Sequence, residues 1–294
     1  MIWNFILNIF LTLAFSFGSP GAIIAGDVSF VNLKPGSPPA PWNSETAGRG
    51  AVLAADDHFF LFSHQADEQQ PIASITKLMT ALVFMDNNPG WDKIYEIRAE
   101  DRIEGGRLNL FLGERVSVRD LFYTSLIASD NGATMALVRS TGLGEEKFVE
   151  LMNQKAIYLG LSQTSFKDPI GLSSGNLSTA REVALLARQA FSVPEIRQAT
   201  VQKDYSFKTE DGRDKLIEST DDLLYVEGLG GLEILGGKTG YTEEAGYCYV
   251  GYMRSNSGQS VISVILGARG RNDRFRASRD LANWTINNFQ WSRY

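Results

Sequence analysis

The pattern of apolar and polar positions predicts strands near both ends of the folded region and helices between them. Short apolar runs bounded by turn residues predict four strands, at residues 50–57, 59–62, 247–253 and 260–266. Apolar positions at helical spacing predict helices at residues 74–86, from 117 onward, 131–138, 145–158, from 179 onward and 272–289. This order predicts an α+β fold, in which an antiparallel β-sheet is flanked by helices and accompanied by a mostly helical lobe.

The amino-terminal 45 residues differ in composition from the rest of the chain. No charged side chain precedes Asp27, and residues 2–18 form a hydrophobic stretch. Residues 1–25 are therefore predicted to be a signal peptide or, alternatively, an N-terminal membrane anchor. Residues 26–45 contain four prolines and are predicted to be an extended linker, so that residues 46–294 form one folded domain. Either leader places that domain outside the cytoplasm, in the periplasm or at the outer face of the cytoplasmic membrane, with membrane association only through the N-terminal segment.

Charge and composition argue against several classes of function. The 294 residues carry a net charge of −6 and no long run of lysine or arginine, whereas nucleic-acid binding requires a clustered basic face. The chain has one cysteine, Cys248, and two histidines, His58 and His64. These are too few for a disulfide within the chain or for an ordinary zinc site. We therefore expect no nucleic-acid partner, no metal and no cofactor.

The first of three short motifs, Ser74-Ile75-Thr76-Lys77, supplies a nucleophile and a nitrogen base. On a helix, side chains three residues apart share one face. A serine hydroxyl needs a base to remove its proton, and a lysine amine can act as that base only when it is neutral. Burial and a neighbouring positive charge both favour the neutral amine. At a helix start, the backbone N–H of Ser74 would also point toward a developing oxyanion.

The second motif, Ser129-Asp130-Asn131, falls in a predicted break between two helices. Such a break can direct two side chains into a cleft. Ser129 could then relay a proton to the leaving amine, and Asn131 offers a donor and an acceptor for the substrate amide and for Lys77. An ordinary helix N-cap is the alternative interpretation, because all three residue types favour that position.

The third motif, Lys238-Thr239-Gly240, follows two glycines and precedes Tyr241. We predict that it lies on a strand that edges the cleft, where glycine allows the backbone to approach a ligand closely. Lys238 would add positive charge, Thr239 could donate to a substrate carboxylate, and the N–H of Tyr241 could complete an oxyanion hole. The three motifs together supply the nucleophile, base and binding groups that acyl transfer requires, without a histidine.

The three motifs and their flanks resemble the D-alanyl-D-alanine carboxypeptidases of peptidase family S11, the low-molecular-mass penicillin-binding proteins. The resemblance extends over roughly residues 50–291 and is most specific at residues 71–80, 168–172, 178–182 and 237–246. It implies a β-lactamase/transpeptidase-like fold. It also implies these roles: nucleophile Ser74, base Lys77, second catalytic element Ser129 and Asn131, substrate-carboxylate side Lys238 and Thr239, and an assisting Arg269.

The resemblance implies a serine D,D-carboxypeptidase that removes the terminal D-alanine from peptidoglycan stem pentapeptides through an acyl-enzyme. β-Lactam antibiotics would be covalent inhibitors. D,D-endopeptidase action on cross-links is an alternative, because the chain stops soon after its last predicted helix and the additional carboxy-terminal domain of many members is absent. A class A-like β-lactamase is disfavoured, since no Glu-x-x-Leu-Asn stretch lies between residues 129 and 238. A non-catalytic wall-binding protein would be expected to lack a motif residue.

Three further sequence features affect this interpretation. The Gly-x-Ser-x-Gly match at residues 171–175 is read as coincidental, because an α/β-hydrolase needs a histidine downstream of it. In the second motif, Asp130 and Gly132 occupy each other's usual places, since the family usually reads Ser-Gly-Asn followed by an acidic residue. Residues 105–110 also differ from the usual small, hydroxyl-rich segment.

Overall fold

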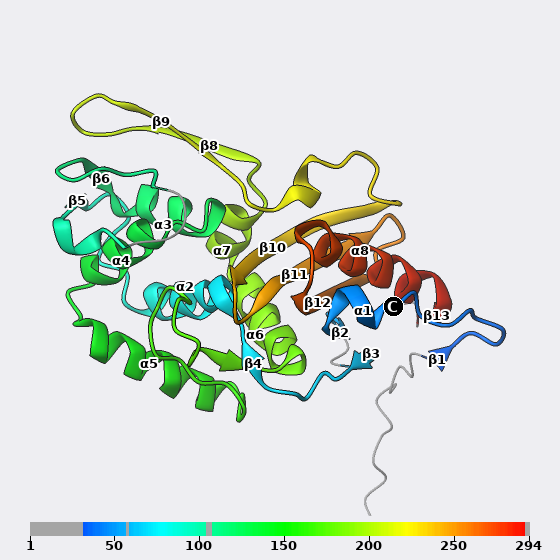
Figure 1. Ribbon diagram of the computed structural model, residues 1–294. Coiled ribbons are helices and arrows are strands. Elements are labelled where there is room, and N and C mark those ends of the chain that lie inside the picture. The colour runs from blue at the N-terminus through cyan, green and yellow to red at the C-terminus, as the bar shows by residue number, and fades with distance from the viewer. Residues whose placement is uncertain (1–31, 57–58, 104–107, 292–294) are drawn as a thin grey trace, which may run out of the picture.

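A five-stranded antiparallel sheet in the order β10-β11-β12-β2-β3 lies at the centre of the molecule. The computed structural model describes residues 32–56, 59–103 and 108–291 (Figure 1). The strands of the sheet are β10 (Leu232–Thr242), β11 (Gly246–Ser255), β12 (Ser260–Ala268), β2 (Arg49–Ala54) and β3 (Phe60–His64). Because β2 pairs with β12, the two predicted strand pairs join in one sheet, which confirms the predicted α+β class.

Helices cover both faces of this sheet, so β12 is buried along nearly its whole length. Val261 and Ile265 pack in one cluster with residues of α8 (Arg271–Asn288). Ile262 and Val264 point to the opposite face, toward α6 (Ala180–Ser192). Each buried aliphatic side chain of this kind stabilises the fold by about 1.5–3 kcal/mol relative to an exposed one. The two apolar clusters therefore fix the sheet between α6 and α8.

The second lobe is built around α2 (Thr76–Asp86), which carries Lys77 in its first turn. Its neighbours are α3 (Val118–Ile127), α4 (Asn131–Ser140), α5 (Glu145–Tyr158) and α6. Residues 76–84 of α2 are all buried. A helix buried on every side lies inside a domain rather than on its surface. Lys77 is consequently carried into the interior, with no exposed surface.

Several short elements complete the lobe and its junction with the sheet. Three antiparallel two-strand pairs are formed by β4 (Gln70–Pro71) with β7 (Leu177–Ser178), β5 (Ile94–Glu96) with β6 (Arg115–Ser117), and β8 (Asp204–Lys208) with β9 (Asp214–Glu218). The other short elements are α1 (Ser44–Ala47), α7 (Pro194–Thr200) and the 3-10 helices η1 (Ala73–Ile75), η2 (Ala99–Asp101) and η3 (Asp222–Tyr225). Pairing of β4 with β7 brings the loop before β7 beside η1, and the β8–β9 hairpin projects from the lobe (Figure 1).

The predicted helix starts are marked by side-chain caps. Ser117 Oγ accepts the N–H of Asp120 at 3.1 Å, and Thr179 Oγ1 accepts the N–H of Glu182 at 3.1 Å. Thr179 and Glu182 form only half of a capping box, because Glu182 does not bond back to the N–H of Thr179. The carboxylate of Glu182 instead accepts the N–H of Gln163 at 2.9 Å and the hydroxyl of Thr164 at 2.5 Å. It therefore ties α6 to the preceding loop.

The described part of the predicted linker lies against the folded domain instead of extending from it. β1 (Asn32–Leu33) pairs with β13 (Phe289–Gln290) just after α8. The indole of Trp42 packs on the rings of Phe62 and His64, with centroids 5.2 and 4.9 Å apart. Proline content predicts an extended chain, but it does not reveal that Trp42 has an aromatic surface to dock on.

The predicted leader, residues 1–25, lies outside the described residues. Among the helices that the structure does describe, none combines the length and the apolar character needed to cross a bilayer.

Candidate active site

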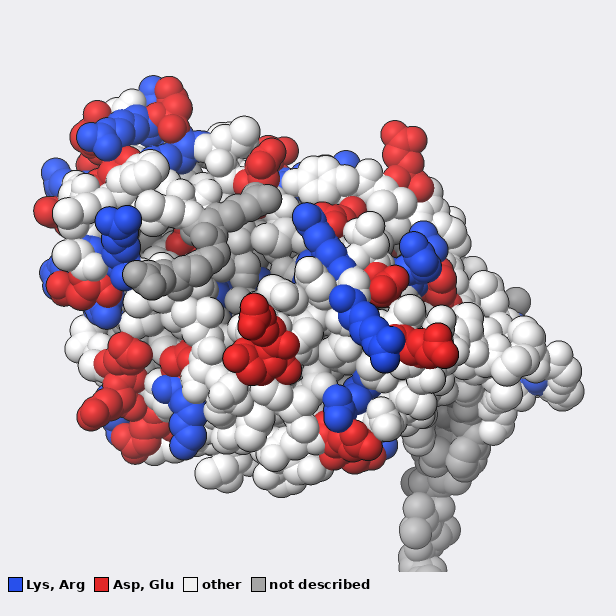
Figure 2. All heavy atoms as spheres, viewed as in Figure 1, with Lys and Arg blue, Asp and Glu red and all other residues white. Residues whose placement is uncertain are grey.

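The three motifs meet at a cleft of about 530 Å³ between β10 and the helical lobe. Six of the residues predicted from sequence line this cleft: Ser74, Ser129, Asn131, Thr239, Gly240 and Tyr241. Lys77 and Lys238 are buried, with 0% and 2% of their surface exposed. On the face shown in Figure 2, acidic and basic side chains are interspersed and neither sign forms a continuous surface.

Ser74 lies in the 3-10 turn η1, immediately before α2 rather than on the helix itself. Ala73 has a positive φ of 48°, which turns the chain sharply ahead of Ser74. Lys77 Nζ lies 3.0 Å from Ser74 Oγ, as the three-residue spacing predicts. It also donates to Asn131 Oδ1 at 2.8 Å and to the carbonyl oxygen of Ile170 at 2.7 Å. The amine is thus held by groups from three separate segments.

Burial controls the protonation of both lysines. It lowers the pKa of Lys77 to about 7, although the charges of Asp130 and Asp168 oppose this shift. Burial also holds the pKa of Lys238 well below its ordinary value, and the nearby charges of Lys77 and Arg274 lower it further. Desolvation is the largest cause for both lysines, and it, rather than the expected positive neighbour, lowers the pKa of Lys77. A neutral Lys77 is accessible near neutral pH.

Ser129 and Asn131 occupy the predicted break between α3 and α4. Ser129 has a φ of 58°, in the left-handed region that a non-glycine residue rarely adopts. Asp130 caps α4 by accepting the N–H of Ala133 at 2.8 Å, so the N-cap interpretation is correct for Asp130. This local geometry exposes Ser129 to the cleft and leaves Asn131 in the first turn of α4, facing Lys77.

The third motif lies on a strand that borders the cleft, as predicted, and this strand, β10, is also the edge strand of the sheet. Its single neighbour in the sheet is β11, so alternate backbone groups of β10 face η1. A Cβ on Gly240 would lie 2.9 Å from the Ile72 carbonyl oxygen and 3.2 Å from the Ser74 nitrogen. Glycine at 240 therefore lets the strand approach the nucleophile's backbone closely.

The side chains of this motif are held by neighbours on β10 and β11 and by groups from other segments of the cleft. Lys238 Nζ donates to Ser129 Oγ at 2.8 Å and to the Thr239 carbonyl at 3.0 Å. Thr239 Oγ1 lies 2.6 Å from the hydroxyl of Thr220, at the entrance to η3. Tyr241 projects at the rim, where its ring stacks on Tyr247 with centroids 4.3 Å apart. The second and third motifs are thus joined directly by the Lys238–Ser129 contact.

A loop at residues 168–176 completes the site, and motif chemistry did not identify its role. The Asp168 carboxylate accepts the N–H groups of Ile170 and Gly171 at 2.8 and 2.6 Å. Asn176 Nδ2 donates to the Asp168 carbonyl at 3.0 Å and to Thr76 Oγ1 at 3.2 Å. These bonds aim the Ile170 carbonyl at Lys77. In the sequence, this loop is marked only by the resemblance of the Asp168-Pro-Ile-Gly-Leu172 stretch to the family.

The arginines are arranged differently from the expectation. Arg269 is exposed just after β12, and it is not among the residues that line the cleft. Arg271 and Arg274, in the first turn of α8, do line it. Arg274 is only 5% exposed and donates from Nη1 to the carbonyls of Gly240 and Cys248, at 3.0 and 3.2 Å. It therefore couples α8 to the floor of the cleft.

Within the described ranges, no group of three or more histidine, cysteine, aspartate or glutamate side chains is arranged to hold a metal ion.

Comparison with known proteins places this geometry in a class. The Peptidase S11 family, described as D-alanyl-D-alanine carboxypeptidase, matches residues 44–270. The crystal structure of the Streptomyces K15 DD-transpeptidase superimposes with a TM-score of 0.77 and 26% identity, covering 85% of this chain and 99% of that one. The fold is therefore that of the penicillin-binding D,D-peptidases, as the resemblance implied.

The chain belongs to peptidase family S11 and is a serine D,D-peptidase of the bacterial cell wall. Curated relatives carry two activities in their names. A D-alanyl-D-alanine endopeptidase of Haemophilus influenzae is 36% identical over 209 residues, 70% of each chain. The D-alanyl-D-alanine carboxypeptidase DacF of Bacillus subtilis is 30% identical over 233 residues, 76% of this chain and 57% of that one. Because the family acts on the cell wall, the protein works outside the cytoplasm.

Proposed function

We propose that the protein is a D,D-carboxypeptidase that removes the terminal D-alanine from peptidoglycan stem pentapeptides. Ser74 is the nucleophile and Lys77 is its base. The observation that carries this proposal is the environment of Lys77 Nζ, which lies 3.0 Å from Ser74 Oγ and bonds two oxygens that cannot donate in return.

Those two oxygens orient the lone pair of a neutral amine. A neutral lysine nitrogen has two N–H groups and one lone pair besides its bond to carbon. Asn131 Oδ1 and the Ile170 carbonyl can only accept, so they occupy the two N–H groups. The remaining lone pair is directed at the hydroxyl of Ser74, which then donates to it. The site is arranged to withdraw the serine proton, and burial lowers the pKa of the amine to about 7, so that a neutral fraction is available near neutral pH.

The reaction then proceeds in two acyl transfers. Ser74 Oγ forms a bond to the carbonyl carbon of the penultimate D-alanine while its proton passes to Lys77. The backbone N–H groups of Ser74 and Tyr241 stabilise the oxyanion. As the C–N bond breaks, Ser129 delivers a proton to the leaving amine. Ser129 is then reprotonated with the proton that Lys77 took from Ser74. Water then attacks the ester, its proton returns through Lys77, and Ser74 is released.

The leaving residue carries a carboxylate, which needs cationic and hydroxyl partners. Lys238 and Thr239 lie on the side of the cleft toward β10, where such a carboxylate would bind. Arg269 is the arginine that the resemblance assigns to this task. Arg274 is a stronger candidate on geometry, because it lines the cleft and contacts the Gly240 carbonyl.

Cleavage of D,D-cross-links is the second candidate activity. Two of the relatives, from Haemophilus influenzae and Pseudomonas aeruginosa, are named endopeptidases, at 36% and 33% identity. The acyl-enzyme is the same in both reactions, and only the leaving amine differs. β-Lactams would acylate Ser74 in either case and remain bound, which would make the protein a poor β-lactamase.

The test supplies purified protein with an uncross-linked pentapeptide muropeptide and, separately, with a cross-linked dimer. Free D-alanine from the first substrate supports the carboxypeptidase, and monomers from the second support the endopeptidase. A Ser74→Ala variant is the matched control. The absence of both products, together with no labelling of Ser74 by a fluorescent penicillin, would overturn the proposal.

A further inference from the structure

Asp130, between two proposed site residues, makes contacts that neither catalysis nor helix capping explains. It is 1% exposed. One carboxylate oxygen, Oδ1, caps α4 through the N–H of Ala133 at 2.8 Å. The other oxygen, Oδ2, accepts both the backbone N–H of Asn109 at 3.0 Å and its side-chain Nδ2 at 2.8 Å. One buried carboxylate thus joins the start of α4 to a segment about 20 residues earlier in the chain.

The segment that Asp130 holds is fixed from its other side as well. Lys215 Nζ, on β9, donates to the Asn109 carbonyl at 3.0 Å. The same nitrogen lies 2.7 Å from the buried carboxylate of Glu114, which also accepts the N–H of Phe111 at 2.8 Å. Asn109 is therefore clamped between the turn at Ser129 and the β8–β9 hairpin.

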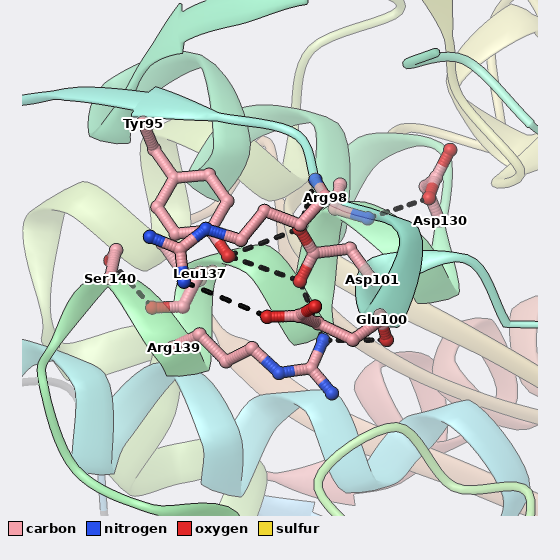
Figure 3. Close-up of polar contacts among 9 residues, drawn as sticks. Tyr95, Arg98, Glu100, Asp101, Asp130, Leu137, Arg139 and Ser140 are labelled. Atoms are coloured by element: carbon pink, nitrogen blue, oxygen red, sulfur yellow. Dashed lines mark hydrogen bonds and ion pairs between the residues drawn. The ribbon is translucent and has the colours of Figure 1, made fainter. Parts of the chain in front are cut away.

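A second buried carboxylate fixes η2 to the same helix. Figure 3 shows Tyr95, Arg98 and Arg139 converging on Asp101, with Asp130 close by. Arg139, on α4, donates to Asp101 Oδ1 at 2.6 Å. A Cβ on Gly132 would lie 3.1 Å from the Asp101 carbonyl oxygen, so η2 rests directly on the first turn of α4. Asp101 thus holds the last turn of α4 through Arg139 and rests on its first turn at Gly132, while Asp130 holds the start of the helix.

This clamp acts where the backbone is strained. Ser129 is in the left-handed region, at φ 58°, and such a residue persists only when its surroundings hold it there. It must also present Oγ to Lys238 while Asn131 presents Oδ1 to Lys77. We propose that Asp130 is a positioning residue, whose contact with Asn109 sets the placement of Ser129 and Asn131 in the cleft.

The charge of Asp130 should affect the pH dependence of acylation, which a purely structural role would leave unchanged. The charged groups around Lys77 are the Asp130 carboxylate at α4, the Asp168 carboxylate in the loop before β7, and Lys238 on β10. Asp130 and Asp168 both favour the protonated amine. Replacing Asp130 with asparagine removes one of these two charges, so the pKa of Lys77 falls. The pH at which the acylation rate begins to fall should then be lower than in the wild-type protein.

Three variants separate the contributions. Asp130→Asn keeps an oxygen for the cap but loses the charge and the acceptor for Asn109. Asn109→Ala loses one of the two bonds and leaves the charge of Asp130 in place. Ser117→Ala removes the N-cap of α3, away from the cleft, and is the control for a loss of helix stability. The measured quantity is the rate at which a fluorescent penicillin acylates Ser74, from pH 5 to pH 9.

Displacement of a catalytic group by about 1 Å lowers a rate by about 10²-fold. We expect about that loss for Asp130→Asn, with the acid limb of the profile moved to lower pH. For Asn109→Ala the acylation rate should fall by about 10-fold, because one bond to Asp130 remains. The acid limb of its pH profile should not move, because the charge of Asp130 is still present. The double variant should match Asp130→Asn alone, since both changes break one contact. Ser117→Ala should lower Tm and leave the acylation rate within about twofold.

The inference rests on Ser74 being the nucleophile, and the experiment separates the two claims. If the wild-type protein is not acylated, the proposed function fails. If wild type is acylated and Asp130→Asn is acylated equally fast with the same pH profile, the positioning role alone is overturned. Additive losses in the double variant would also overturn it. Should Asp130→Asn not fold, Asn109→Ala carries the test, and an unchanged rate there contradicts the proposal.

Discussion

Lys77 and Ile170 are joined by a hydrogen bond of 2.7 Å that spans 93 residues of chain. The donor belongs to the most recognisable motif in the sequence, whereas the acceptor is a backbone carbonyl that no motif describes. Together with Asn131, this carbonyl determines which way the lone pair of the proposed base points.

Removing the proposed nucleophile or base should abolish turnover. For Ser74→Ala and for Lys77→Ala we expect release of D-alanine, or opening of cross-links, to fall by about 10⁴- to 10⁶-fold, as in other enzymes that lose such a group. Product analysis by chromatography gives the rates, and Tm checks folding. Near-normal turnover by either variant would contradict the assignment.

The pKa of Lys77 predicts the pH dependence of acylation. Burial lowers this pKa to about 7, and the base is active only when neutral. The acylation rate of Ser74 should therefore rise with pH through about 7 and level off above it. Stopped-flow measurements with a chromogenic β-lactam between pH 5 and pH 9 test this. A limb centred above pH 9 would show that the amine stays protonated and cannot be the base.

Gly171 packs closely against the backbone of Ala73 and Ser74. Its φ is 89°, and a Cβ there would overlap the Ala73 carbonyl and lie 2.9 Å from the Ser74 nitrogen. Gly171→Ala should cost about 1–3 kcal/mol from backbone strain, with a further loss from the overlap. It should also slow acylation, because η1 must shift.

Gly142→Ala is the matched control for this change. Gly142 has a similar φ of 82°, but no atom lies within 4 Å of the added Cβ. Urea unfolding of both variants isolates the effect of the close approach. Equal stability losses and equal acylation rates in the two variants would mean that the close approach of Gly171 to η1 has no effect on stability or on the nucleophile.

A pair of variants distinguishes the two arginines proposed for the substrate carboxylate. A hydrogen bond to a charged group contributes about 1.5–3 kcal/mol, so losing it lowers kcat/KM by about 10- to 100-fold. Arg274→Gln should show that loss, whereas the exposed Arg269→Gln should stay within about twofold. Arg274→Lys, which retains the charge, tests whether two carbonyl contacts alone explain the effect. The reverse order of losses would favour Arg269.

Asp221 should make stability depend on pH. Burial raises its pKa from 3.8 to about 6, so between these values the folded state binds more protons than the unfolded chain. Its contribution is present below pH 4 and is lost as pH rises through 6, amounting to about 2–3 kcal/mol. Asp221→Asn should flatten the stability profile between pH 4 and pH 7. Parallel profiles from urea unfolding would contradict this.

Local sequence signals predicted much of the scaffold. The helix predicted at residues 145–158 has those bounds in the structure, because an amphipathic stripe ends before Gly160, a helix-terminating glycine. The β8–β9 hairpin and the two-residue strands were missed, since runs so short carry little periodicity. Trp42 was assigned to a linker because its docking surface comes from β3, which a reading of local composition does not include.

The site was predictable where chemistry resides in side chains. The three motifs and their order identified the groups that meet in the cleft, including Ser74, Lys77 and Lys238. The Ile170 carbonyl could not be identified, because every residue has one and only the fold selects which carbonyl is used. Asp130 and residues 105–110 appeared as two separate departures from the family pattern. The structure reveals that they are in contact, through Asn109.

The cleft draws on residues from η1, near position 74, to Arg274 in the final helix. No stretch of polypeptide that ends before α8 can assemble it, however well the earlier lobe folds. In a growing or translocating chain, Ser74 is therefore present about 200 residues before Arg274, the last residue that lines the cleft. Hydrolytic capacity is in this way postponed until α8 has been made and has packed against the sheet.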